Sequence, residues 1–316
     1  MELNKAKNIE RIRQLSLLFM LLLEIVLFSL LAERFFSFSN AISILRQVSV
    51  TGISAMGMFM IILLGDIDLS VGSMYAFIGV ISALIFKTTE SAVLAIIAAL
   101  VIGTVIGFIN GTITAKFKIP AFITTLATMS VCSGLAYIIT KGTPIGVTNP
   151  AFTFLGSGYV AGVIPLPIIF MLIVLALGYF TMYKPRFGRH IYACGGNAQA
   201  AKWSGINADK IKVLVFVIAG FLNGFAAIVL AGRLGGGLPS AGDGSEMDVI
   251  TAVVLGGTSM TGGKGKLWGV VLGVLIIGVL TVGLTMVGVS SYWQNVIKGI
   301  IIVVAVIIDT KGAKTA

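Results

Sequence analysis

The chain has 316 residues, of which 57% are hydrophobic and only 11% are charged, and its mean hydropathy is +1.06. Since about a quarter of the residues in an average soluble domain are charged, this composition excludes an ordinary soluble globule. The net charge of +10 does not indicate a nucleic-acid-binding protein, because the basic residues lie in short connectors between apolar runs. The two cysteines, Cys132 and Cys194, are too few for a disulfide framework.

Apolar windows bounded by charge, proline or glycine occur along the whole chain. They fall at about 15–32, 44–64, 70–86, 92–115, 120–140, 163–183, 211–232, 249–261, 267–288 and 293–308. About 20 apolar residues cross the hydrocarbon layer of a membrane, so these windows predict an all-α, polytopic transmembrane helix bundle with about ten spans. The first window follows basic residues, as in a signal peptide, but no A-x-A-like cleavage site comes after it, so we interpret it as a retained span.

The distribution of Lys and Arg predicts the orientation of the bundle. If the N-terminus is cytoplasmic, the segments on that side hold 16 of the 22 basic residues and the opposite loops hold Arg34, Lys87, Lys141 and Arg233. This asymmetry satisfies the positive-inside rule with both termini cytoplasmic. We therefore expect a cytoplasmic N-terminal segment at 1–14, a transmembrane domain at 15–309 and a cytoplasmic tail at 310–316. Five spans followed by five more would also allow a five-plus-five inverted repeat.

Glycines recur every four residues within several windows: Gly103, Gly107 and Gly111; Gly220 and Gly224; Gly269 and Gly273. Small residues at this spacing let helix backbones approach closely in lipid. This pattern indicates helix packing rather than a transport role.

The run from Gly65 to Ser73 places two carboxylates, Asp66 and Asp68, between long apolar windows with almost no loop. Charges in such a position are costly in a membrane and call for a reason. One interpretation is a broken helix whose backbone, with Asp66, Asp68, Ser70 and Gly72, lines a translocation path or gate. The other is a tight turn in which Asp68 or Ser70 caps the next helix.

The longest basic connector covers residues 184–210. In its centre, Asn197 is a good N-cap, alanines including Ala200 and Ala201 fill a short helical body, and Gly205 is a typical terminator before Ile206. A short helix outside the membrane is suited to dock on another protein, and the alternative is a solvated connector.

Residues that would carry chemistry are few. His190 is the only histidine, so we expect neither a catalytic triad nor a histidine metal cluster, and we assign no catalytic or metal site. The stretch Thr258 to Lys266 fails the phosphate-loop pattern G-x-x-x-x-G-K-[ST], which predicts that the chain has no ATPase site of its own and binds no cofactor. Glu24 in the first window and the acidic, glycine-rich segment 235–248 are open to either a contact role or a purely structural one.

Several ordered motifs resemble those of the ribose-type permeases of bacterial ABC sugar importers, which belong to the branched-chain amino acid/ribose permease family. They are the run Gly65 to Ser73, the segment Gly188 to Asn197 with Ala200-Ala201 and Ser204 to Ile206, and Val254 to Ser259 with Gly262-Gly263. The similarity extends from about residue 40 to Asp309.

The resemblance implies a sugar-transporting membrane subunit in the bacterial cytoplasmic membrane, surrounded by lipid and working by alternating access. Its partners would be a second permease copy or a paralogue, ABC ATPase subunits that use ATP on the cytoplasmic face, and a periplasmic or lipid-anchored sugar-binding protein. Asn197, Ala200, Ala201, Gly205 and Ile206 would then form the ATPase-coupling segment. The main alternative is an ion-coupled secondary transporter that uses Asp66 and Asp68, with Glu24 as a further candidate.

Overall fold

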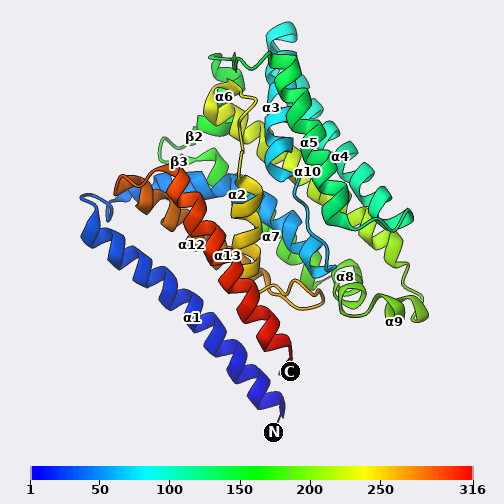
Figure 1. Cartoon of the computed structure of the whole chain (residues 1–316). Helices are drawn as coiled ribbons and strands as arrows, with labels where there is room; N and C mark the ends of the chain where they lie inside the picture. Colours follow the sequence, from blue (N-terminus) through cyan, green and yellow to red (C-terminus); the bar gives the residue numbers. More distant parts are fainter. Residues whose placement is uncertain (1, 185, 315–316) are drawn as a thin grey trace.

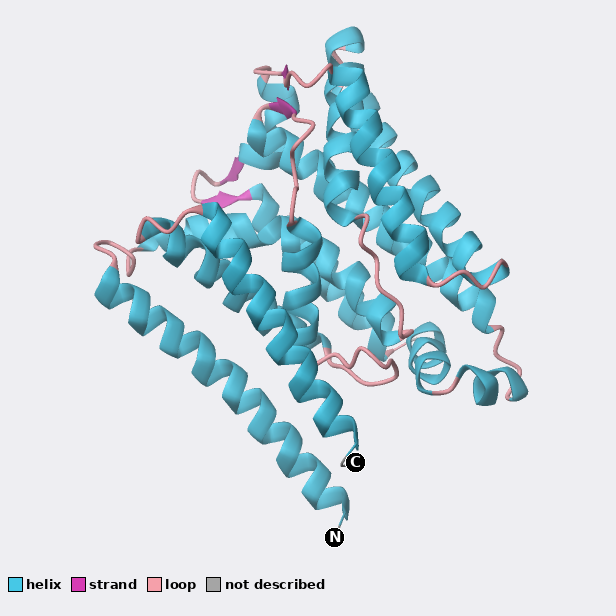
Figure 2. Ribbon diagram, viewed as in Figure 1, coloured by secondary structure: helices cyan, strands magenta, loops and turns pink. Residues whose placement is uncertain are grey.

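The computed structural model describes residues 2–184 and 186–314 and is built almost entirely from helices (Figures 1 and 2). The side chains of residues 2–14 and 308–314 are outside this description, so the expected segments 1–14 and 310–316 stay predictions. The helices within the described residues are α1 Glu2–Leu31, α2 Phe38–Leu63, α3 Val71–Thr89, α4 Ala92–Lys116, α5 Ala121–Thr140, α6 Pro150–Ser157, α7 Leu166–Tyr183, α8 Arg186–Gly196, α9 Ala198–Trp203, α10 Ala208–Leu234, α11 Ser245–Leu255, α12 Leu267–Met286 and α13 Ser291–Lys314.

Each of the ten apolar windows overlaps a helix, although the eighth, 249–261, extends beyond the end of α11 at Leu255, and the predicted all-α bundle is confirmed. Among the described residues, seven helices are long and apolar enough to span a membrane, namely α2, α3, α4, α5, α7, α10 and α12. α1 and α13 contribute shorter apolar stretches, Leu15–Leu31 and Ser291–Ile307, and α11 has only 11 residues. The multi-pass character follows from the seven helices, whereas the count of about ten spans stays a prediction.

α2 lies at the centre of the bundle, where it packs against α7, α10, α11 and α12. α3, α4 and α5 form one side of the molecule and α10 packs along α4, while α1 runs beside α12 at the opposite edge (Figure 1). The N-terminal and C-terminal ends of the chain lie at the same end of the bundle as α8 and α9 (Figure 1).

The glycine pattern is explained by helix packing, as predicted. The two stripes on α4 and α10 face each other: a Cβ at Gly103 would overlap the carbonyl oxygen of Gly220, and one at Gly220 would overlap that of Gly103. In the same way, Gly273 of α12 lies against the backbone of Ala252 in α11. These contacts bring helix backbones together where lipid offers no hydrophobic driving force.

The end of the bundle opposite α8 and α9 carries structure that the sequence analysis treated as loop. α6 begins at Pro150 behind Asn149, whose side chain accepts a hydrogen bond from the Ala151 N–H at 2.9 Å. Two short antiparallel pairs also form there, β1 Ile145–Gly146 with β4 Gly236–Gly237, and β2 Tyr159–Val160 with β3 Ile164–Pro165. β1 and β4 join the α5–α6 connection to the segment that follows α10.

Candidate transport and coupling sites

The helical path is interrupted between α2 and α3, as the Gly65 to Ser73 run suggested. Residues 64–70 run as a loop inside the bundle (Figure 2), starting with a left-handed Gly65 at φ +77°. Such backbone is tolerated at membrane depth only where protein or a water-filled cavity surrounds it. Here α5 helps to supply the missing bonds, because Leu69 N–H donates to Thr125 Oγ1 at 3.0 Å.

The two carboxylates of this segment have different local roles. Asp66 forms an ion pair with Lys212 of α10, with 2.7 Å between Oδ2 and Nζ. Burial raises the pKa of Asp66, and the nearby Lys212 ammonium opposes that rise. Asp68 is only 3% exposed, and its Oδ1 accepts hydrogen bonds from Ser70 N–H at 2.8 Å and Ser70 Oγ at 2.5 Å. A carboxylate in this position complements the positive end of the α3 dipole, but the N-cap residue is Ser70 and makes no side-chain cap hydrogen bond, so Asp68 forms a turn before α3 rather than a cap.

Ser70 continues the polar contacts into α4 and α5. Asn110 Nδ2 of α4 lies 3.4 Å from Ser70 Oγ, and Asn110 Oδ1 accepts from Thr128 Oγ1 of α5 at 2.6 Å. Asn110 and Thr128 lie within apolar helices and Ser70 directly precedes one, so an unpaired polar group at any of these positions would be costly. The start of α3 is therefore fixed to two neighbouring helices.

A second non-helical segment enters the bundle from the other end, where residues 235–244 connect α10 to α11 (Figure 2). Its tip meets the start of α3: a Cβ at Gly72 would overlap the Gly242 carbonyl oxygen and the Glu246 carboxylate. Tyr75 of α3 then donates to Ser54 Oγ of α2 at 2.6 Å. α3 and α11 thus begin at one place inside the bundle and run toward opposite ends. Gly72 therefore lies in a tight contact between the two halves of the chain.

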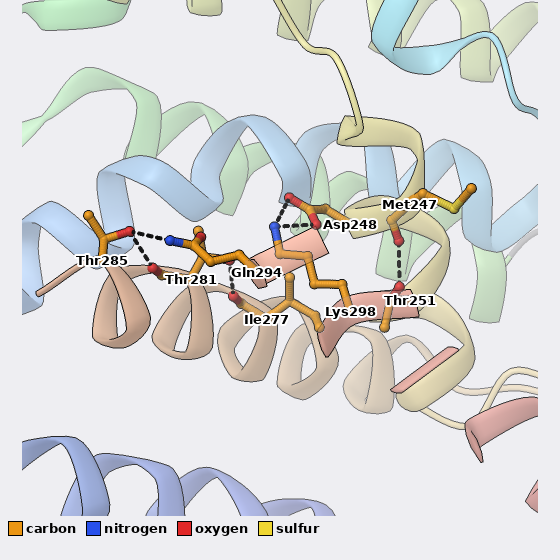
Figure 3. Close-up of polar contacts among 8 residues, drawn as sticks. All are labelled: Met247, Asp248, Thr251, Ile277, Thr281, Thr285, Gln294 and Lys298. Carbon is orange, nitrogen blue, oxygen red and sulfur yellow. Dashed lines mark hydrogen bonds and ion pairs between the residues drawn. The ribbon is translucent and has the colours of Figure 1, made fainter. Parts of the chain in front are cut away.

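α11 is held to α13 by a polar contact that the sequence analysis did not identify (Figure 3). Lys298 Nζ lies 2.8 Å from Asp248 Oδ1 and 3.0 Å from Oδ2, and their side chains are 9% and 22% exposed. One turn earlier on α13, Gln294 Nε2 donates to Thr285 Oγ1 at 3.1 Å. Two features of the sequence could have indicated this ion pair. Lys298 lies alone inside an apolar window, and the acidic segment 235–248 includes the first turn of α11.

Glu24 takes no part in either of these clusters. It is partly buried on α1, which packs against α12, and its Oε2 has no hydrogen-bond partner among the described residues.

The connector 184–210 holds two helices rather than one. α8 buries Gly188, Ile191 and Cys194 on one face. A Cβ at Gly195 would overlap the carbonyl oxygen of Leu63, the last residue of α2. The same oxygen accepts from Gly263 N–H at 2.8 Å, and Tyr192 Oη donates to the Gly265 carbonyl at 2.9 Å. α8 is therefore fixed to the end of α2 and to the turn that follows α11.

α9 is the short helix predicted around Ala200 and Ala201. Asn197 accepts from Ala200 N–H at 2.9 Å as its N-cap, and Gly205 follows it in the left-handed conformation at φ +81°. The Ile206 N–H closes the end by donating to the Ala201 carbonyl at 3.0 Å. Of the five predicted coupling residues, Ala201 is buried against the protein. The other four are exposed or half-exposed: Asn197, Ala200, Gly205 and Ile206.

Comparison with known proteins identifies the family. The model of the family described as branched-chain amino acid transport system / permease component matches residues 40–306. The chain belongs to this permease family. Similar family members are the ribose import permease proteins RbsC of Haemophilus influenzae, 44% identical over 92% of this chain and 90% of the relative, and of Bacillus subtilis, 43% identical over 91% and 89%. The xylose transport system permease XylH of H. influenzae is 34% identical over 89% and 91%. No solved structure matches the chain.

Membership confirms the resemblance to the ribose-type permeases of sugar ABC importers. The family consists of membrane transport subunits rather than catalytic enzymes, which agrees with the absence of a catalytic assignment in the sequence. It also favours the importer over the ion-coupled alternative, since the similar family members are named as sugar import or sugar transport permeases.

Proposed function

We propose that this chain is the permease subunit of an ABC importer that moves ribose or a related monosaccharide across the bacterial cytoplasmic membrane. The observation that carries the proposal is the 44% identity to a ribose import permease over 92% of the chain. The permease would contain no ATPase site and would be powered by ATP that a separate ATPase subunit binds and hydrolyses.

In this proposal α8, α9 and both termini face the cytoplasm, where the basic connectors belong by the positive-inside rule. α1, α11 and α13 join the seven long helices to give ten crossings, with α11 as a half-length one. The opposite starts of α3 and α11 support a five-plus-five inverted repeat, in which they would be equivalent elements. A sugar-binding protein would dock at the α6 end, and a second copy or a paralogue would complete the membrane dimer.

The coupling path would begin at α9 and end at the α2–α3 segment. When the ATPase subunits close, α9 moves with them and α8 transmits the motion, because Gly195 lies directly on the carbonyl of Leu63. The loop that carries Asp66 and Asp68 begins directly after Leu63, and Gly72, at the start of α3 beyond the loop, contacts Gly242. ATP can shift the equilibrium between the inward and outward states only by the difference in its affinity for them, and a rigid connection would couple that difference to the membrane helices.

The proposal is tested by reconstituting the chain with its ATPase subunit and candidate binding proteins in liposomes. We expect a pentose or related monosaccharide to stimulate ATP hydrolysis only with the cognate binding protein, and uptake to require ATP. Uptake driven by a proton or sodium gradient without an ATPase subunit would contradict it and restore the ion-coupled alternative.

The orientation is tested by labelling single cysteines in whole cells with a membrane-impermeant maleimide. Cys194 itself is buried, so Ser204→Cys in a Cys132→Ser/Cys194→Ser background is the better probe, because residue 204 is exposed at the end of α9. We expect Ser204→Cys to react only after the membrane is permeabilised, and Thr143→Cys, exposed at the other end, to react in intact cells. The reverse pattern would place α9 outside.

A further inference from the structure

Trp203, the last residue of α9, is 80% exposed although tryptophan is among the residues most strongly stabilised by burial. The opposite side of the same helix faces the protein, where Ala201 is 4% exposed. The ring therefore projects away from the bundle at the end where the ATPase subunit is proposed to bind. An exposed tryptophan on a short helix outside the membrane-spanning segments is available as an anchor for a partner protein, since tryptophan is enriched among the residues that carry most of the binding energy at interfaces.

The neighbours of Trp203 favour a protein over the membrane surface as the molecule that covers it. A helix that lies on a membrane needs a broad apolar face, but the other exposed residues of α9 are small or polar: Ala198, Gln199, Ala200 and Lys202. One aromatic among small residues is typical of a binding anchor, because the small residues permit close approach while the ring fills a pocket.

The positive charge of the side chains around α9 indicates which charge the partner's surface carries next to Trp203. Exposed basic residues gather at this end of the bundle: Lys116, Lys118, Lys184, Arg186, Arg189, Lys202, Lys210 and Lys264. The exposed acid Asp209 is already paired with Lys118. Complementarity therefore requires a partner whose contact surface is acidic.

α9 is held in place at both ends, which favours tight binding through a side chain that it presents. Asn197 and Gly205 fix its two ends, and α8 is held to the end of α2 through Gly195. A ring presented on a fixed helix binds without the cost of ordering a flexible loop. Because α9 and α8 are held in this way, a force that the partner applies at Trp203 would be transmitted to the membrane helices.

We propose that Trp203 is the anchor of the ATPase interface and inserts into an apolar pocket with an acidic rim on the ATPase subunit. This inference rests on the proposed function and adds the residue and the chemistry of the partner's pocket. The partner's carboxylates would surround the ring and face Lys202 and the other basic side chains.

The test measures the affinity of the purified ATPase subunit for the full-length permease in nanodiscs. We expect Trp203→Ala to weaken binding by about tenfold or more, and Trp203→Phe to retain most of the affinity, since a phenyl ring still fills the pocket. Trp268→Ala is the matched control, because Trp268 lies in the first turn of α12 and is 60% exposed without belonging to α9. An affinity for Trp203→Ala within about twofold of the unsubstituted permease would overturn the inference.

Fluorescence separates the pocket from the membrane surface. In a Trp268→Phe/Trp293→Phe permease, Trp203 is the remaining tryptophan, and we expect its emission to shift to shorter wavelength when the ATPase subunit is added. Quenching by brominated lipid in the absence of the ATPase subunit would show a membrane anchor instead and overturn the inference. If no ATPase subunit binds the unsubstituted permease or drives its transport, the proposed function itself is refuted. The Trp203 variants do not test that function.

Discussion

At the scale of single residues, glycines decide where the two halves of the chain meet. Gly72 is the point at which the start of α3 contacts the segment before α11, and a side chain there has no space. Gly79, two turns later on α3, is different, because an added Cβ would stand 3.4 Å from the Cβ of Ala231. Gly72 belongs to the Gly65 to Ser73 run, and the lack of space for a Cβ is the steric reason for a glycine at this position.

Gly72→Ala should impair transport strongly, whereas Gly79→Ala should be close to neutral. The added methyl at residue 72 forces the Gly242 backbone and the Glu246 carboxylate away, and such overpacking costs about 1–3 kcal/mol. The measurement is sugar uptake in liposomes at matched protein levels, and we expect at least a tenfold loss for Gly72→Ala. Equal uptake by the two variants would show that the contact does not constrain the transport cycle.

At the scale of elements, α11 and α13 depend on each other through the pair Asp248–Lys298. α13 packs mainly on α11, and much of its remaining surface is exposed. Because both charged groups are largely removed from solvent, loss of one partner leaves the other uncompensated in an apolar setting. α13 is thus held by this ion pair together with apolar side chains such as Ile297 and Ile301, which pack against the core.

Lys298→Ala should lower stability by about 3–5 kcal/mol, the usual cost of breaking a buried pair. The double variant Asp248→Ala/Lys298→Ala should recover part of this loss, because no unpaired charge remains. Thermal unfolding in detergent measures both, with the exposed Lys87→Ala at the end of α3 as a control for general charge loss. If the double variant is as unstable as the sum of the two single ones, the pair is not coupled.

At the scale of the whole molecule, the proposed transport cycle requires that motion be transmitted from one end of the bundle to its middle. α8 touches the end of α2, and the broken segment that follows α2 carries the polar residues of the candidate path. The contact is made backbone to backbone, so it transmits displacement without a flexible side chain between the parts.

Two adjacent glycines offer a matched test of this transmission. Gly195→Ala places a methyl group against the Leu63 carbonyl, whereas the space around a Cβ at Gly196 is open within 4 Å. We expect Gly195→Ala to keep ATPase binding but to lose at least about tenfold in sugar molecules transported per ATP hydrolysed, and Gly196→Ala to behave like the parent. Normal stoichiometry in Gly195→Ala would show that the force follows another route.

The sequence by itself determined the membrane class, the positions of the ten apolar helices, the glycine stripes, the break after α2 and the capped helix α9. All of these depend on local composition or on periodicity, which neighbouring residues along the chain express directly. The ordered motifs were also sufficient to indicate the permease family.

Only the tertiary structure decided which partners these residues meet. The ion pairs Asp66–Lys212 and Asp248–Lys298 join residues far apart in the chain, as does the contact of Gly72 with Gly242. α8 was missed because its two glycines near the C-terminal end and its basic residues suggested a loop, and its helix is stabilised by packing against α7, α10 and the end of α2. Such partners are chosen by how the helices pack in space, a property that no local pattern records.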